Sequence, residues 1–253
     1  MDLGLKGLRV LVTGSTKGIG RATAEIFAQE GAQVAVCART ADEVAATVSA
    51  LTANGATAIG RALDVGDGAA LAGWVTDAAE QLGGLDIVVA NVSALAIPDN
   101  PENWRTSFEV DLMHTVRMVE AALPHLERSS APAIVTVSSV SAREIDFTAG
   151  PYGTFKAALV HYTQGLAFQL AAKGIRANTV SPGNTYFDGG IWQHIEHNNP
   201  ELYAEALGLN PTGRMARPEE IAKAVVFAAS PAVPFMTGTN IVVDGALTRG
   251  VQL

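Results

Sequence analysis

The sequence predicts a doubly wound α/β fold, in which a seven-stranded parallel sheet carries helices on both faces. Three observations support this prediction. Short apolar runs alternate with longer segments whose apolar residues recur every three or four positions, as in strands joined by right-handed helical crossovers. A glycine-rich turn follows the first apolar run. The chain has 253 residues and is 48% apolar, which is enough to bury one large core.

The first half of the chain follows this alternation closely. Residues 8–12 are an apolar run bounded by glycines, which suits a buried parallel strand. The apolar spacing from Ile19 to Phe27 predicts a helix that ends at Gly31. The elements that follow are strand 33–38, helix 41–53, strand 57–63, helix 67–82, strand 86–90 and helix 101–126.

The second half begins in the same way and then becomes irregular. Strand 134–139, a helix from 152 to about 173 and strand 175–181 continue the pattern. The segment 184–217 is rich in Asn, Gly, Pro and aromatic residues, and we interpret it as a partly helical substrate lobe carried by the sheet. Helix 218–230 and strand 238–243 follow. We expect residues 1–253 to form a single domain.

Composition and charge exclude several kinds of partner. Charged residues make up 17% of the chain and the formal net charge is −8, so we expect no nucleic-acid or membrane partner. Cys37 is the only cysteine, which excludes an intrachain disulfide and a metal site built on thiolates. The first residues match neither a signal peptide nor a membrane span. We expect a cytoplasmic protein.

The turn over residues 13–20 lies between the first predicted strand and the first predicted helix. Glycines there let a pyrophosphate approach backbone N–H groups at the positive end of a helix. The turn therefore predicts a dinucleotide site, with a purely structural turn as the alternative. The expected binding residues are Gly14, Ser15, Thr16, Lys17, Gly18, Ile19 and Gly20.

The end of the second predicted strand favours NADP(H) over NAD(H). NAD-binding proteins usually place a carboxylate there, near the ribose 2′-OH, whereas a nearby arginine accommodates the 2′-phosphate of NADP. This strand ends without an acid and is followed by Arg39, and Lys17 can add a second positive charge. The alternative is that both cations are solvated surface residues.

A strand end and a helix face bring three reactive side chains together. The strand 134–139 ends in two serines, Ser138 and Ser139. Tyr152 and Lys156 lie four residues apart near the start of the next helix, so their side chains share one face. A hydroxyl, a phenol and an ammonium can therefore meet.

These motifs together resemble the short-chain dehydrogenase/reductase family over essentially the whole chain. The resemblance rests on the turn TGxxxGxG, the spacing of Ser139, Tyr152 and Lys156, and Pro182-Gly183 after a strand. Among its members, the sequence looks most like bacterial reductases of the 3-oxoacyl-carrier-protein type. The resemblance implies a Rossmann fold and an NAD(P)(H)-dependent oxidoreductase that forms a homotetramer or homodimer.

The resemblance also implies roles for the three side chains. Tyr152 would protonate the carbonyl oxygen as hydride arrives, or act as the base in the reverse direction. An isolated phenol has a pKa of about 10, and the Lys156 ammonium favours its ionisation. Lys156 would also hold the ribose hydroxyls, and Ser139 would orient the substrate oxygen. Ser138 competes for this last role, although alternation along the strand puts the two serines on opposite faces.

Further cofactor contacts are implied on both sides of the sheet. Asp64 and Val65 match the position that contacts adenine, with Asp64 as a simple helix cap as the alternative. Pro182 and Gly183 match the motif after the sixth strand, and Thr185 falls near the position that meets the nicotinamide carboxamide.

Two positions depart from the family pattern. Asn91 matches the asparagine of the family's NAG motif, but Val92-Ser93 follow it, so a side chain enters where the family brings bare backbone close to the cofactor. Asp111 stands where the family usually has an asparagine that helps anchor a water relay to Lys156. Aspartate is nearly isosteric but lacks amide donors and can carry charge. We expect catalysis to survive. The alternative is a catalytically impaired NADP(H)-binding regulatory or scaffold protein.

The substrate pocket should form from residues 94–98, 141–148 and 184–192, because ligands bind beyond the carboxyl ends of the strands. Tyr186, Phe187, Ile191 and Trp192 predict a lid over an apolar or aromatic carbonyl or alcohol substrate, with ordinary core packing as the alternative.

His194 and His197 flank Glu196 without a third ligand in view, so we predict no metal site.

Overall fold

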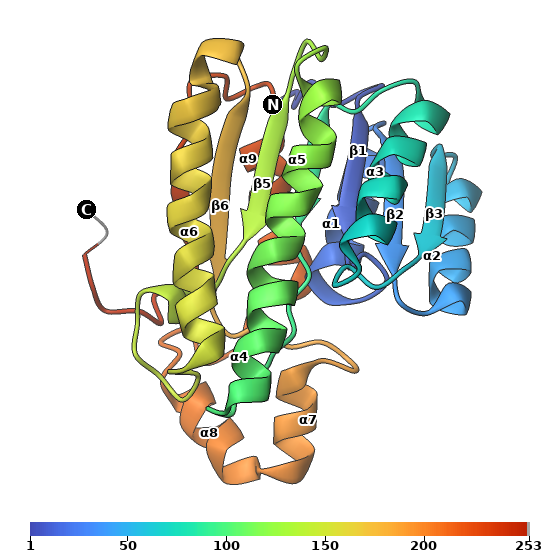
Figure 1. Cartoon of the computed structure of the whole chain (residues 1–253). Coiled ribbons are helices and arrows are strands. Elements are labelled where there is room, and N and C mark those ends of the chain that lie inside the picture. Colours follow the sequence, from blue (N-terminus) through green and yellow to red (C-terminus); the bar gives the residue numbers. More distant parts are fainter. Residues whose placement is uncertain (252–253) are drawn as a thin grey trace.

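The computed structural model describes residues 1–251, and within them seven strands form one sheet (Figure 1). The strand order is β3-β2-β1-β4-β5-β6-β7, and every neighbouring pair is parallel. The strands are β1 (Arg9–Thr13), β2 (Gln33–Ala38), β3 (Ala58–Ala62), β4 (Ile87–Ala90), β5 (Ala133–Val137), β6 (Arg176–Pro182) and β7 (Asn240–Val243). The predicted doubly wound Rossmann fold is confirmed.

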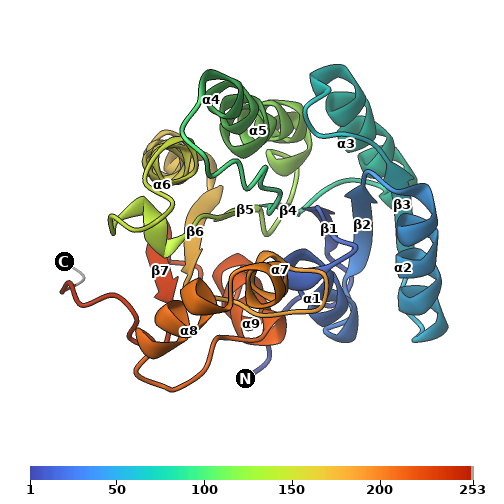
Figure 2. The same cartoon turned by 90° about the horizontal axis from the view of Figure 1, so that it is seen from below.

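Helices cover both faces of the sheet (Figure 1 and Figure 2). Helices α3, α5 and α6 lie on one face, and α1, α2 and α9 lie on the other. Leu11 and Ile134 pack toward the first layer, whereas Val10 and Val135 pack toward the second, which explains why the strands are continuous apolar runs. The helices are α1 (Gly18–Gln29), α2 (Ala41–Ala53), α3 (Gly68–Leu82), α4 (Pro101–Ser107), α5 (His114–Leu126), α6 (Pro151–Leu170), α7 (Ile191–Asn198), α8 (Pro200–Gly208) and α9 (Pro218–Ala229).

The strand order reverses beside β1. The chain proceeds from β1 to β2 and β3, and then returns to β4 on the other side of β1. The carboxyl ends of β1 and β4 therefore flank the crevice in which open α/β sheets bind ligands. The lobe of residues 184–217 contains α7 and α8, as its partly helical prediction requires, and lies beyond these strand ends (Figure 1). Trp192, Ile195 and Met215 belong to a small core within the lobe.

Three predicted elements differ in their bounds, two of them near the crevice. The helix expected over 101–126 is divided into α4, the π-helical turn η1 (Phe108–Met113) and α5; the wider turn holds the buried Asp111. The strand expected to reach Ser139 ends at Val137, because the Ser139 hydroxyl accepts the Ser141 N–H and begins the 3₁₀ turn η2 (Val140–Ala142). The helix expected to reach about residue 173 ends at Leu170 and tightens into the 3₁₀ turn η3 (Ala171–Lys173).

Residues 1–251 contain neither a membrane-spanning helix nor a cluster of metal ligands. Of the helices within residues 1–251, none is both long enough and apolar enough to cross a bilayer. In that part of the chain no three His, Cys, Asp or Glu side chains gather as ligands for a metal ion. His194 contacts Asn198, and Glu196 accepts a hydrogen bond from the Tyr186 hydroxyl.

Candidate active site

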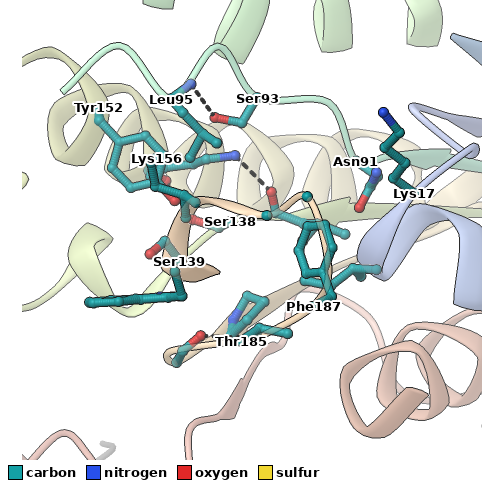
Figure 3. A pocket seen from close by; sticks show the side chains of 18 residues that line it. Lys17, Asn91, Ser93, Leu95, Ser138, Ser139, Tyr152, Lys156, Thr185 and Phe187 are labelled. Carbon is teal, nitrogen blue, oxygen red and sulfur yellow. Dashed lines mark hydrogen bonds between the residues drawn. The ribbon is translucent and has the colours of Figure 1, made fainter. Parts of the chain in front are cut away.

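A cavity of about 340 Å³ lies at the carboxyl ends of the strands (Figure 3). Its walls come from the glycine turn, from the segments after β4, β5 and β6, and from the lobe. A second hollow of about 510 Å³ lies beside it, and the two share Lys17, Asn91 and Ser93 in their walls. Together they form an extended site that begins at Arg39 and ends at Trp192.

Ser139, Tyr152 and Lys156 all line the first cavity. Pro151 occupies the first position of α6, where its fixed backbone angle suits a helix start. Tyr152 follows it in the first turn, and Lys156 lies one turn further along the helix. The Lys156 Nζ lies 5.7 Å from the centre of the Tyr152 ring. It donates a hydrogen bond of 3.1 Å to the Val137 carbonyl oxygen (Figure 3). The three side chains that the sequence singles out therefore share one cavity.

The two neighbouring serines have different partners. The Ser138 hydroxyl donates to the Lys156 carbonyl oxygen at 2.8 Å, so it attaches α6 to the end of β5. The Ser139 hydroxyl accepts the Ser141 N–H at 3.1 Å and donates to the Ser141 hydroxyl at 3.2 Å. Ser138 is therefore engaged with the backbone of α6, whereas the partners of Ser139 lie within its own loop.

Asp111 lies beneath this cavity in η1 and is fully buried. Its Oδ1 is 3.6 Å from the Lys156 Nζ, and neither carboxylate oxygen accepts a hydrogen bond within residues 1–251. Burial lowers the pKa of Lys156, and the Asp111 carboxylate opposes this shift. Burial also raises the pKa of Tyr152 to about 12; the Ser139 hydroxyl lowers it, whereas the charges of Asp111 and Asp146 raise it.

The glycine turn brings its backbone against the crevice. Gly14 and Gly18 have φ angles of 63° and 53°, a region that other residues rarely adopt. A Cβ atom on Gly20 would collide with the Gly14 carbonyl oxygen, so Gly20 permits close packing of α1 on the turn. Ile19 lines the first cavity. Ser15 is buried, and its hydroxyl donates to the Val12 carbonyl oxygen at 2.9 Å.

The far end of the second hollow contains both predicted cations and an acid that the sequence analysis missed. Arg39, Lys17 and Glu43 line it, together with Thr16. The Lys17 Nζ lies 2.8 Å from Glu43 Oε1, and the Thr16 hydroxyl donates to Glu43 Oε2 at 3.2 Å. The hydrogen bond from Lys17 lowers the pKa of Glu43. The position of Glu43 in the first turn of α2, shortly after the end of β2, could have indicated a carboxylate near the two cations.

Asp64 and Val65 also line the second hollow. Asp64 Oδ1 accepts the Gly66 N–H at 2.9 Å. The alternative that Asp64 caps the next helix is wrong, because Asp67 caps α3 by accepting the N–H groups of Ala69 and Ala70.

Asn91 connects β4 to the glycine turn. Its Nδ2 donates to the carbonyl oxygens of Thr13 and Gly14, each at 3.1 Å. The Val92 side chain lies against Gly14, since a Cβ atom there would be 2.8 Å from Val92 Cγ2. The side chain expected at this point of the crevice is therefore present and in contact with the turn.

Pro182, Gly183 and Thr185 line the opposite wall of the first cavity. The Thr185 hydroxyl donates to the Gly183 carbonyl oxygen at 3.1 Å. Of the aromatic and apolar cluster predicted in the lobe, Phe187, Ile191 and Trp192 line the cavity. Tyr186 instead packs against the small core of the lobe.

Phe187 makes a contact that sequence spacing did not indicate. A Cβ atom on Gly18 would lie 2.6 Å from the Phe187 ring, so the ring rests on the glycine turn.

His114 is a second residue near the site that the sequence analysis did not single out. It is buried beside η1, and its ring contacts the Val110 carbonyl oxygen and the Thr13 hydroxyl. Burial lowers the pKa of His114 to about 4, so this imidazole is neutral.

Known proteins resemble the chain over its whole length. A family model described as enoyl-(acyl carrier protein) reductase matches residues 14–248. Isoepoxydon dehydrogenase patN of Penicillium expansum is 40% identical over 259 residues, which cover 100% of this chain and 99% of that protein. A 3-oxoacyl-[acyl-carrier-protein] reductase of Vibrio harveyi is 31% identical and covers 97% of this chain and 99% of its own.

A solved structure is also similar to this chain over its whole length. The structure of L-sorbose reductase from Gluconobacter frateurii, complexed with NADPH and L-sorbose, superimposes with a TM-score of 0.91 at 27% identity, covering 99% of this chain and 100% of that one. The sequence matches and this superposition agree with the motifs in the crevice. The chain is therefore an oxidoreductase that belongs to the short-chain dehydrogenase/reductase family.

Proposed function

We propose that this protein interconverts a carbonyl and an alcohol by hydride transfer with NADP(H), using Tyr152 as general acid or base. The observation that carries the proposal is the meeting of Ser139, Tyr152 and Lys156 in one cavity that adjoins the hollow of the glycine turn. The similarity of the chain to a dehydrogenase and to reductases supports this reaction class.

The residues of the extended site fit a dinucleotide. The positive φ angles of Gly14 and Gly18 let the turn lead directly into the start of α1, where backbone N–H groups can bind phosphate groups. Such a cofactor supplies the hydride when it is bound. The proposed contacts toward its adenosine half are Gly14, Thr16, Lys17, Arg39, Asp64 and Val65, and those toward its nicotinamide half are Ile19, Asn91, Tyr152, Lys156, Pro182, Gly183 and Thr185. Ser15, Gly18 and Gly20 shape the turn.

The proposed proton transfer follows from the surroundings of Tyr152. Since burial raises its pKa to about 12, the phenol retains its proton at neutral pH and can donate it to a carbonyl oxygen. Alcohol oxidation needs the phenolate, which the nearby Lys156 ammonium stabilises. Ser139 holds the reacting oxygen beside the phenol, and Asp111 supports Lys156 from below.

The preference for NADP(H) is proposed from Arg39. It lines the hollow beyond β2, without the carboxylate on its own strand end that would meet a ribose 2′-OH. Lys17 is a weaker argument than the sequence alone indicated, because Glu43 pairs with it at 2.8 Å. NAD(H) is the less favoured cofactor.

We propose an apolar or aromatic substrate and a homotetramer or homodimer. Leu95, Phe187, Ile191 and Trp192 supply apolar side chains to the lining of the cavity. The oligomeric state is proposed from the family resemblance. We further propose a single domain and a cytoplasmic location.

A cofactor and substrate panel tests the proposed function. Oxidation of NADPH and NADH is followed with β-ketoacyl thioesters, quinones, cyclic ketones and keto-sugars, with Tyr152→Phe as the control. We expect turnover with NADPH that Tyr152→Phe abolishes. Equal rates with both cofactors would contradict the Arg39 argument, and retained turnover in Tyr152→Phe would contradict the proton-transfer role.

The buried Asp111 supports a second candidate, a catalytically impaired NADP(H)-binding regulatory protein, because its carboxylate replaces an amide that the family uses. Tight binding of NADPH without turnover of any ketone or aldehyde in the panel would favour this candidate over the enzyme.

A further inference from the structure

In the π-helical turn η1, a side chain takes the place of a backbone hydrogen bond. In an α-helix the N–H of residue 114 would donate to the carbonyl oxygen of Val110, four residues earlier. Here the His114 N–H donates to the Glu109 carbonyl oxygen, five residues earlier. The Val110 carbonyl oxygen instead contacts Nδ1 of the His114 imidazole. The imidazole thus fills the place in the helical hydrogen-bond pattern that the wider turn leaves open.

The surroundings of the imidazole determine where its proton lies. A carbonyl oxygen can only accept a hydrogen bond, so Nδ1 carries the proton and donates to Val110. His114 is buried, and burial lowers its pKa to about 4, so the ring is neutral at neutral pH. Its Nε2 lies 3.5 Å from the Thr13 hydroxyl oxygen, which accepts the Asn91 N–H at 3.1 Å. The ring therefore lies between η1 and the strand ends that form the crevice.

The carbonyl that His114 holds is directly joined to Asp111. The peptide unit between Val110 and Asp111 is planar, so a hydrogen bond to its oxygen also fixes the direction in which the Asp111 side chain leaves the backbone. The Asp111 carboxylate is fully buried and lies 3.6 Å from the Lys156 Nζ. Within residues 1–251 neither of its oxygens has a hydrogen-bond partner. The position of this carboxylate therefore depends on the backbone of the turn.

We propose that His114 is a positioning residue, whose hydrogen bond from Nδ1 to Val110 keeps the π turn wide and so holds the Asp111 carboxylate beside Lys156. This inference rests on the proposed function, in which Lys156 assists Tyr152. Without the Nδ1 donor, the His114 N–H can return to the Val110 carbonyl oxygen, as in an α-helix. The turn then rearranges and carries Asp111 away from Lys156.

The neutral state of the imidazole makes this role testable. The charges that face Tyr152 are those of Lys156 on α6, Asp111 on η1 and Asp146 on the loop after β5. Of these, Lys156 and Asp111 also face the His114 ring. Replacing a neutral ring removes no charge. His114 therefore acts on Tyr152 through the groups that it positions.

The test is the pH profile of kcat/KM for alcohol oxidation with NADP⁺, whose rising limb reports ionisation of the general base. The Asp111 charge raises the pKa of Tyr152. We expect His114→Leu, which is similar in size but has no donor, to release Asp111 and to lower the midpoint of this limb by about one unit, the effect of one nearby charge.

Two amide variants locate the effect at Nδ1. His114→Asn places an amide N–H donor near the position of Nδ1 and should keep the limb at the wild-type position. His114→Gln places its amide near the position of Nε2 and should shift the limb as His114→Leu does, so it carries the same test if His114→Leu does not fold.

Thr115→Val is the matched control. Thr115 is the next residue along the chain, is fully buried, and has a hydroxyl without a hydrogen-bond partner in the described part of the chain. The control should leave the limb unchanged. A double variant tests the route of the effect. In Asp111→Asn protein, His114→Leu should cause no further shift, because the charge that it displaces is already absent.

An unmoved or upward-shifted limb in both His114→Leu and His114→Gln overturns this inference. An equal shift in His114→Asn or in Thr115→Val also overturns it, since general loosening of the turn would then explain the effect. So does a full further shift in the Asp111→Asn background. Absence of alcohol oxidation by the wild-type protein overturns the proposed function and this inference with it, whereas normal wild-type turnover with unshifted variants overturns this inference alone.

Discussion

At the scale of single residues, the carboxylate of Asp111 lies in the protein interior with one charged neighbour. Its Oδ1 is 3.6 Å from the Lys156 Nζ, and it receives no hydrogen bond within the described residues 1–251. A buried charge that is paired but poorly hydrogen-bonded is costly. The charge acts on that lysine, since it opposes the lowering of the Lys156 pKa by burial.

Asp111→Asn should leave turnover within about tenfold of wild type, because the amide has nearly the same shape and removes one charge. Since the Asp111 charge raises the pKa of both Tyr152 and Lys156, the pH profile of kcat/KM should move to lower pH. Steady-state kinetics across pH measure both effects. Glu109→Gln is the matched control, because Glu109 lies in the same turn but pairs with Arg117. A gain of several orders of magnitude in Asp111→Asn would show that the wild-type enzyme is impaired.

Glu43 is a carboxylate beside the two cations that are proposed to bind a 2′-phosphate. It neutralises Lys17 at 2.8 Å and lines the same hollow as Arg39. Glu43→Gln should tighten NADPH binding about threefold and leave NADH binding unchanged, the size expected for an exposed charge pair. Cofactor fluorescence titration measures both dissociation constants, with Glu25→Gln on α1 as a control that pairs with Arg21. Equal tightening for both cofactors would contradict the role of Glu43 at the 2′ position.

At the scale of elements, local patterns predicted the fold and the reactive trio, whereas contacts between distant segments were not predictable. The spacing of Tyr152 and Lys156 and the glycine turn depend on neighbours within one element or one connection, so their periodicity is visible in the sequence. Phe187 reaches Gly18 from the lobe, and that contact depends on how the lobe folds over the sheet. The π turn around Asp111 was missed for a related reason, since apolar spacing does not distinguish it from a continuous α-helix.

The glycine turn should not tolerate a side chain at Gly20. Gly20→Ala should destabilise the protein by about 2 kcal/mol or more and weaken cofactor binding at least tenfold, because a Cβ atom would collide with the Gly14 carbonyl oxygen. Thermal unfolding and cofactor titration measure the two effects. Gly73→Ala in α3 is the matched control, because its Cβ atom would meet nothing within 4 Å. It should raise stability slightly, by about 0.5–1 kcal/mol. Similar behaviour of the two variants would show that the turn tolerates a side chain.

Across the whole molecule, one end of the sheet carries the candidate site and the other end stabilises the fold. The carboxyl ends of the strands carry the cavity and the hollow, where polar groups are left available to a ligand. At the opposite end, Asp86 precedes β4 and joins it to β1 and to the segment before β5. It accepts hydrogen bonds from the Arg9 N–H, from the Arg9 guanidinium at 2.7 Å and from the Ser129 hydroxyl. The end of the sheet opposite the cavity is therefore held together by an ion pair between Asp86 and Arg9, in which both carboxylate oxygens accept hydrogen bonds.

The pH dependence of stability should report this contact. Burial alone would raise the pKa of Asp86, but the hydrogen bonds from Arg9 and Ser129 outweigh it, so the pKa lies below its ordinary value of 3.8. Because the folded-state pKa is lowered, the carboxylate contributes stability above pH 3.8, and that contribution is lost as the pH falls through the lower folded-state value. Asp86→Asn should therefore destabilise the protein by about 3 kcal/mol at pH 7, the cost of breaking a buried pair.

This difference from wild type should shrink steadily as the pH is lowered from 3.8, where Asp86 of the unfolded chain takes up a proton, to the lower folded-state pKa, where the folded protein does so as well. Chemical unfolding at a series of pH values measures it. Glu127→Gln is the control, because its pair with Lys173 is exposed and such pairs contribute less than about 1 kcal/mol. A difference between wild type and Asp86→Asn that stayed constant from pH 7 down to pH 2.5 would mean that shape alone, and not charge, makes Asp86 stabilising. The amino end of the sheet would then be held by packing, and the division of tasks between its two ends would no longer follow from charge.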